Sequence, residues 1–214
     1  MKTFLKFLVI IFLPLSFSNP LKASELLQDA EELVKSTWTT YKNSEYGFEF
    51  SYPDSLHTSS EFLTSSHITD KWSHDAEYSL GTGTAIVSVP VLIINNTEDV
   101  YPKYFWTEVR IGISNNPNTV KNCVLSTENS PSNSSLNINN VNFQVFNIEE
   151  AGMMQYAKGL SYRTVHDNKC FVIEQIKAGS NRMSNPNPQD ISDKILESYY
   201  YLTGKIIKTF KFIN

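Results

Sequence analysis

The chain of 214 residues is 41% hydrophobic and contains 13 phenylalanines and 11 tyrosines, which is enough apolar surface for a folded core and excludes a disordered chain. Its formal net charge is −4. An acidic surface repels phosphate backbones, so we expect no nucleic-acid partner.

The first 23 residues have the pattern of a secretory signal peptide. Lys2 and Lys6 precede an apolar run over residues 7–17, and the small Ala23 follows. The apolar run is about half of the roughly 20 residues that a membrane-spanning helix needs, so we expect no membrane span. The sequence therefore predicts a soluble, exported protein, secreted or periplasmic, with a single domain over residues 24–214.

Residues 24–52 predict a helix followed by a β-hairpin. Apolar residues recur at helical spacing over residues 24–36, with acidic residues between them, and Ser24 can cap this helix. In "YKNSEYGFEFSYP", aromatic residues alternate with polar ones after a turn, until Pro53 ends the second strand. Residues 54–78 are polar and indicate a surface segment or a short helix.

The middle of the chain predicts two long strands and then a loop. Residues 82–94 are rich in β-branched residues, and Pro90 indicates an edge position or a bulge. Residues 104–114 alternate regularly, with Phe105 and Val109 on one face and Trp106, Glu108 and Arg110 on the other. The stretch "STENSPSNSSLNINN" is almost free of apolar residues, so we expect a mobile loop there.

The last third predicts strands, a helix and a terminal strand. Asp167 and Asn168 suit the turn of a hairpin over residues 159–177. After residue 190 an apolar stripe at helical spacing indicates a helix that Asp190 can cap and Gly204 ends, and "KIIKTFKF" alternates as a strand would. Hairpin-connected strands with helices at both ends predict an α+β fold, in which helices sandwich an antiparallel sheet.

Two segments resemble the PsbP-like family. The opening hairpin "YKNSEYGFEFSYPDSL" is similar to the start of PsbP-like domains, and the final helix with "IIKTFKF" is similar to their last helix and strand. The resemblance implies a central antiparallel sheet with helices on both sides. It also implies a protein without enzymatic activity, and it transfers no functional residues.

The stretch "GLSYRTVHDNKCF" allows two interpretations of Cys170. With His166 as a base, Cys170 could be the nucleophile of a secreted thiol-dependent hydrolase, while His166 and Asp167 would otherwise only shape the turn. Cys123 is the single other cysteine, and exported cysteine pairs are usually oxidised. We therefore favour a Cys123–Cys170 disulfide over a catalytic thiol.

A metal site is an alternative hypothesis. His67, Asp70 and His74 would share one face of a helix, and Asp75 adds a further oxygen donor. The compact His-x-x-x-His pair of the stronger zinc motifs is missing, and a solvated polar face explains the same residues. The sequence also contains no nucleophile elbow, Walker loop, dinucleotide fingerprint or HExxH motif, so we expect no metal, no cofactor and no enzymatic activity.

Clustered aromatic residues leave a binding surface as the leading hypothesis. Three successive tyrosines on one helix cannot all be buried, because they span about 200° of its circumference. Exposed aromatic residues and methionines are typical of interfaces with a protein or small ligand. The candidate surface comprises Tyr101, Tyr104, Phe105, Trp106, Met153, Met154, Tyr156, Tyr199, Tyr200 and Tyr201. The sequence predicts an exported binding or accessory protein with an unidentified partner.

Overall fold

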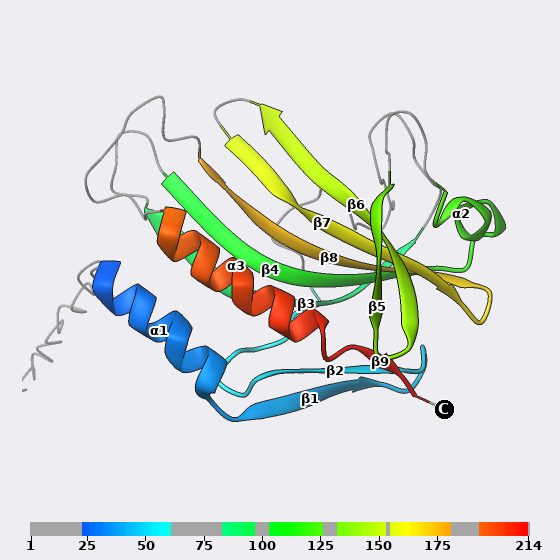
Figure 1. The fold of residues 1–214 in the computed structure, drawn as a ribbon, viewed down its shortest axis with the longest axis horizontal. Coiled ribbons are helices and arrows are strands. Elements are labelled where there is room, and N and C mark those ends of the chain that lie inside the picture. The colour runs from blue at the N-terminus through cyan, green and yellow to red at the C-terminus, as the bar shows by residue number, and fades with distance from the viewer. Residues whose placement is uncertain are drawn as a thin grey trace, which may run out of the picture.

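A computed structural model describes residues 23–60, 83–96, 103–125, 132–152, 155–180 and 193–213. Its strands form two antiparallel sheets (Figure 1). The larger sheet has the order β3-β4-β8-β7-β6-β5, formed by β3 (Thr84–Asn96), β4 (Lys103–Ser114), β8 (Lys169–Ser180), β7 (Gln155–His166), β6 (Val141–Gly152) and β5 (Ser132–Ile138). The smaller sheet has the order β1-β2-β9, formed by β1 (Trp38–Asn43), β2 (Phe48–Pro53) and β9 (Lys211–Phe212).

The described helices are α1 (Ala23–Lys35), α2 (Pro117–Asn122) and α3 (Asp193–Ile207). α3 runs across one face of the larger sheet and contacts β4, β8, β3 and β2, while α1 packs beside it (Figure 1). α2 follows β4 and contacts β8. The mixed α/β architecture with antiparallel sheets confirms the coarse fold prediction. The amphipathic helix predicted over residues 24–36 is also confirmed, since Leu26, Ala30 and Leu33 are buried.

The hairpins follow local turn chemistry. Asp167 and Asn168 both have positive φ values, 46° and 55°, so a two-residue turn joins β7 to β8 as predicted. Asn139 and Asn140 make the same kind of turn between β5 and β6, with φ values of 47° and 67°. Asparagine and aspartate adopt this conformation more readily than most other residues, which makes both hairpins compatible with their sequences.

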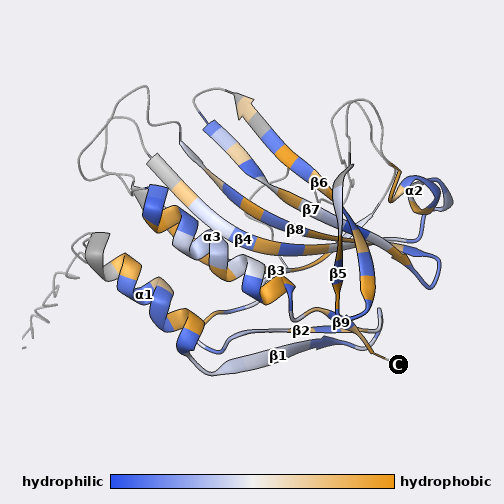
Figure 2. Ribbon diagram, viewed as in Figure 1, coloured by the Kyte–Doolittle hydropathy of each residue, from blue (hydrophilic) through white to orange (hydrophobic). Residues whose placement is uncertain are grey.

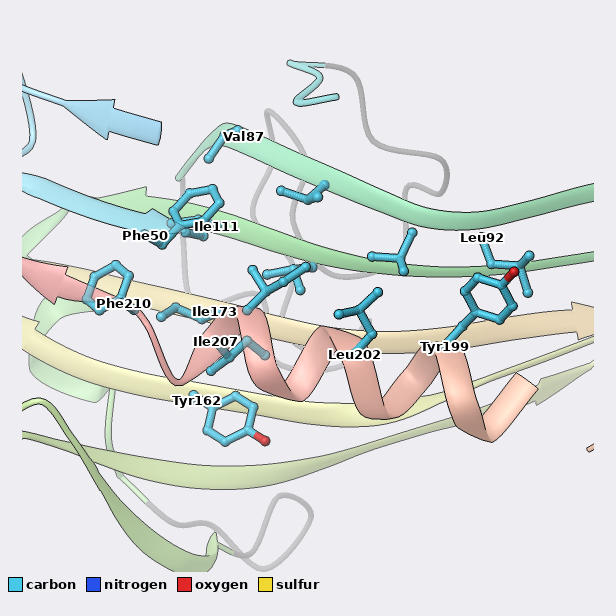
Figure 3. Packing of buried hydrophobic residues seen from close by; sticks show 14 of the residues in the cluster. Phe50, Val87, Leu92, Ile111, Tyr162, Ile173, Tyr199, Leu202, Ile207 and Phe210 are labelled. Atoms are coloured by element: carbon cyan, nitrogen blue, oxygen red, sulfur yellow. The ribbon is translucent and has the colours of Figure 1, made fainter. Parts of the chain in front are cut away.

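The central strands β4, β8 and β7 of the larger sheet carry buried side chains on both faces. Apolar residues occur along these strands (Figure 2) and lie on both faces, since Ile176 and Ala178 of β8 form a separate buried cluster with Ile148 of β6 on the face opposite α3. Phe105, Val109 and Ile111 of β4 lie in the core under α3 together with Ile173 of β8. Tyr199, Leu202 and Ile207 of α3 face them (Figure 3).

The predicted end of the last helix was wrong. α3 continues through Gly204 to Ile207, and the final strand is only Lys211–Phe212. The reason is that the apolar stripe of α3 continues past Gly204, with Ile206 and Ile207 buried in the core. Asp190, predicted as the cap of this helix, lies outside the described residues.

The predicted loop over residues 126–140 was partly wrong, because β5 begins at Ser132. β5 is an edge strand of the larger sheet and pairs only with β6 among the described strands. Its exposed residues include Ser134, Ser135 and Asn137. A solvated edge strand does not need an apolar face, since its register follows from the Asn139–Asn140 turn.

Candidate binding surface

The two cysteines form a disulfide, as predicted. Cys123 and Cys170 are bonded, with a Cα–Cα distance of 5.7 Å, and both are fully buried. No free cysteine remains, since the sequence contains only these two. In this structure Cys170 therefore has no thiol that could act as a nucleophile.

His166 lies on the other face of the hairpin from Cys170. Cys170 pairs with Val165, and His166 pairs with Lys169, so side-chain alternation places the Cys170 sulfur and the His166 ring on opposite faces. The His166 ring stacks on Phe212 of β9, with a centroid distance of 3.7 Å and an interplanar angle of 11°. The nucleophile and base of the hydrolase hypothesis are thus not assembled.

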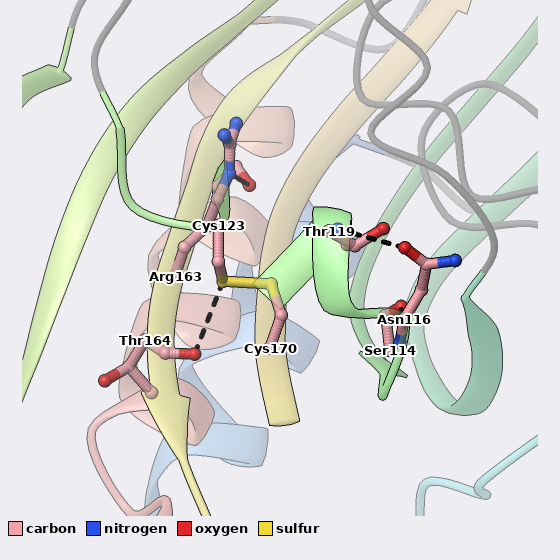
Figure 4. The surroundings of a disulfide bond; sticks show 8 residues. Ser114, Asn116, Thr119, Cys123, Arg163, Thr164 and Cys170 are labelled. Atoms are coloured by element: carbon pink, nitrogen blue, oxygen red, sulfur yellow. Dashed lines mark hydrogen bonds between the residues drawn. A yellow bond between two sulfur atoms is a disulfide. The ribbon is translucent and has the colours of Figure 1, made fainter. Parts of the chain in front are cut away.

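α2 presents Cys123 to the sheet. The Asn116 side chain caps this helix by accepting hydrogen bonds from the backbone N–H groups of Asn118 and Thr119. Figure 4 shows the bond from Thr119. Pro117 occupies the first turn, where no N–H is needed. Cys123 ends the helix, and its Sγ lies 3.5 Å from the carbonyl oxygen of Thr164. The disulfide therefore holds α2 against the face of the sheet opposite α3.

The proposed metal ligands His67, Asp70, His74 and Asp75 lie outside the described residues. Among the residues that are described, no group of three or more His, Cys, Asp or Glu side chains is placed to hold a metal ion.

The three successive tyrosines of α3 have three different environments. Tyr199, expected on the binding surface, is instead buried, and its hydroxyl donates a hydrogen bond to Asp29 Oδ2 of α1 at 2.6 Å. Tyr200 is partly buried at the sheet. Tyr201 is 57% exposed. Burial, followed by the contact with Asp29, raises the pKa of Tyr199, and burial also raises the pKa of Tyr200.

A polar network fixes the middle of α3 to the sheet. The Tyr162 hydroxyl donates to Gln175 Oε1 at 2.9 Å, and Gln175 Nε2 donates to the carbonyl oxygen of Tyr200 at 2.9 Å. Burial raises the pKa of Tyr162 to about 12. Because this network joins β7, β8 and α3, the exposed part of the helix is held in one position.

Tyr200 and Tyr201 each have a lysine close to the ring. Lys177 Nζ lies 4.7 Å from the centroid of the Tyr200 ring and also forms an ion pair with Glu197. Lys205 Nζ lies 5.0 Å from the centroid of the Tyr201 ring. A hydrogen bond with Lys205 lowers the pKa of Tyr201. These positions place cations over aromatic faces, where the ring quadrupole attracts them.

Those of the other predicted surface residues whose side chains are described do not form one surface. Trp106 of β4 and Tyr156 of β7 lie near the same end of the larger sheet, but on opposite faces, because Trp106 aligns with Ala178 and Tyr156 with Gly179. Phe105 is buried under α3. Tyr104 lies in β4, and Tyr101, Met153 and Met154 fall outside the described residues.

The face opposite α3 carries buried charges that sequence reasoning had not singled out as a site. Ser88, Arg110, Glu174 and Ser161 form one cross-strand row over β3, β4, β8 and β7. Each is at most 3% exposed. The alternation of residues 104–114 had placed Glu108 and Arg110 on a shared face, but only the three-dimensional packing shows that this face is also buried.

No protein-family model matches the chain, and no curated protein is significantly similar to it. None of the helices described here has both the length and the apolar character needed to cross a membrane.

Proposed function

We propose that this chain is an exported binding or accessory protein without catalytic activity, and that it contacts a protein partner through the outer side of α3. The observation that carries the proposal is Tyr201, which is 57% exposed at the middle of a helix whose other apolar side chains are largely buried. Exposed tyrosines on rigid elements are typical anchors of protein interfaces.

The rigid attachment of α3 to its neighbours supports Tyr201 as part of the binding surface. Tyr199 anchors the same turn to α1 through Asp29, and Gln175 holds the Tyr200 carbonyl group from the sheet. Tyr201 is therefore presented from a fixed backbone, and little conformational entropy is lost when a partner covers its ring. Lys205 beside the Tyr201 hydroxyl adds a charged donor at the edge of the same surface.

The proposal also includes a secreted or periplasmic location and a PsbP-like fold. The disulfide supports a secreted or periplasmic location, because disulfides persist in oxidising compartments. The hairpin of β1 and β2 and the final helix supply the two segments that resemble PsbP-like domains. We propose a PsbP-like fold in which helices flank the larger sheet, with the accessory role that is typical of this family.

Site-specific crosslinking tests the binding surface. A photoreactive phenylalanine analogue at position 201 should give one dominant crosslinked protein in the native envelope or culture medium. The control carries the same analogue at Thr39, which is exposed on β1 of the smaller sheet. A product found at position 201 and absent at position 39 supports the proposal. No product at position 201, or the same products at both positions, contradicts it.

A further inference from the structure

Two of the three arginines of this chain are buried. Its 18 basic residues include only three arginines, Arg110, Arg163 and Arg182. Arg110 and Arg163 both lie on the face of the larger sheet opposite α3, where they are 0% and 2% exposed. A buried guanidinium group loses its hydration and needs compensation by acceptors or charges. The two arginines differ in how much of this compensation the described residues supply.

Arg110 is compensated by neighbouring carboxylates. Its Nε and Nη2 atoms donate to Glu108 Oε1 at 2.8 and 2.5 Å. Glu174 Oε2 lies 3.9 Å from its Nη1 atom. Two acidic groups therefore surround this one guanidinium group, which makes Arg110 part of a local charge cluster of the sheet.

The guanidinium group of Arg163 has a fixed orientation, but its Nη1 and Nη2 atoms donate none of the described hydrogen bonds. Its Nε donates to Ser161 Oγ at 3.1 Å, and its Cζ lies 3.7 Å from the centroid of the Phe146 ring. These two contacts fix the plane of the guanidinium group. Within the described part of the chain, the contacts of the Arg163 guanidinium group are the Nε hydrogen bond to Ser161 and the Phe146 ring, and none of them involves Nη1 or Nη2 as a donor. The terminal fork is thus preorganised for an acceptor.

We propose that Arg163 binds the carboxylate group of a small ligand with an apolar body, through the fork formed by its Nη1 and Nη2 atoms. A planar fork matches the two oxygens of a carboxylate in a bidentate contact. The surroundings suit an apolar body, because Arg163 aligns with Val172 and lies beside the Cys123–Cys170 bridge (Figure 4). This site is independent of the proposed function, since Tyr201 lies on α3 across the sheet.

The charge of the site favours a monoanion. Burial lowers the pKa of Arg163 to about 9, while the Glu174 carboxylate raises it, so the guanidinium group is charged at neutral pH. One carboxylate would neutralise this single charge. A phosphate dianion would leave an uncompensated negative charge near Glu174, which is costly in a buried environment.

Nitrogen NMR of the chain with ¹⁵N-labelled arginine tests the proposal. Only three side-chain Nε signals are expected, and Arg-to-Lys variants at positions 110, 163 and 182 assign them, two of the three being sufficient if one variant does not fold. Benzoate is the probe, benzyl alcohol is the neutral control of similar shape, and inorganic phosphate tests for a general anion site. The full chain with its disulfide intact is used.

The expected result is a saturable shift of the Arg163 signal with benzoate and none with benzyl alcohol. Arg163→Lys should weaken benzoate binding by about tenfold or more, because an ammonium group cannot replace the bidentate fork. Arg182→Lys should leave benzoate binding unchanged. An unmoved Arg163 signal overturns the proposal, and so does an equal shift with phosphate, which would indicate an adventitious anion only.

Discussion

Gln175 of β8 donates a hydrogen bond to the carbonyl oxygen of Tyr200 in α3 at 2.9 Å, while it accepts one from the Tyr162 hydroxyl of β7. One amide group therefore satisfies polar groups of two other elements, in a place where Gln175 and Tyr162 are both buried. The outer side of α3, where we place the binding surface, depends on this contact for its position.

Gln175→Leu should lower the free energy of unfolding by about 1–3 kcal/mol, because the Tyr162 hydroxyl loses its described hydrogen-bond partner in a buried site. Urea unfolding monitored by circular dichroism measures the change. Gln28→Leu is the matched control, since Gln28 donates to Glu32 on the exposed side of α1 and should change the stability by less than about 0.5 kcal/mol. Equal effects of the two substitutions would show that the Gln175 network does not stabilise the fold.

Gly159→Ala should destabilise the protein by about 1–3 kcal/mol through overpacking. A Cβ atom at this position of β7 would lie 1.9 Å from the carbonyl oxygen of Gln175, which is backbone and cannot move without disturbing the sheet. Thermal and urea unfolding of the variant measure the loss.

Gly204→Ala is the control for that substitution. Its Cβ atom would approach only the side-chain amide of Gln175, at 3.2 Å, and alanine favours the helix over glycine by about 1 kcal/mol. We expect unchanged or slightly increased stability. If Gly159→Ala is as stable as Gly204→Ala, the close approach of β7 to β8 is not present in solution.

The disulfide should contribute about 4 kcal/mol to stability, because it closes a loop between cysteines 47 positions apart in the sequence and so restricts the unfolded chain. The double variant Cys123→Ala, Cys170→Ala should lose this contribution in urea unfolding. A thiol titration of the denatured, unreduced protein should find no free thiol, and titration after reduction should find both. Free thiols before reduction would revive the hydrolase hypothesis for Cys170.

Stability should fall at alkaline pH, and Tyr162 should contribute to this fall together with Tyr199 and Tyr200, whose pKa values are also raised. The pKa of Tyr162 is raised from 10.0 to about 12 in the folded state, so between these values the unfolded chain loses a proton that the folded chain keeps. This contribution is fully present below pH 10 and is lost as the pH rises toward 12. Urea midpoints measured across this window should fall less steeply for Tyr162→Phe than for the unchanged chain. Parallel slopes would contradict the role of Tyr162.

The elements with strong local signals could be predicted from the sequence. Residues 104–114 alternate apolar and polar side chains, and this alternation is found in β4. Asp167 and Asn168 form the predicted turn, because their side chains tolerate positive φ values. The pairing of Cys123 with Cys170 followed from the number of cysteines and the predicted export.

Features that depend on distant residues could not be predicted in this way. β5 has almost no apolar pattern and forms a strand because β6 offers it a pairing edge. His166 follows Val165 in a strand, but its stacking partner Phe212 comes from the smaller sheet, so no local pattern indicated the environment of the His166 ring. Burial of Arg110 and Arg163 had no local signal either, since a polar strand face is usually solvated.

The sequence by itself thus determined the alternation of β2 and β4, the Asp167–Asn168 turn and the disulfide, because alternation, turn conformation and cysteine parity are properties of short segments or of composition. The tertiary structure alone decided which face of each strand is covered and which side chains meet there. Tyr199 became a core residue, Tyr201 remained exposed and Arg163 became buried, because each outcome depends on packing between elements that are far apart in the chain.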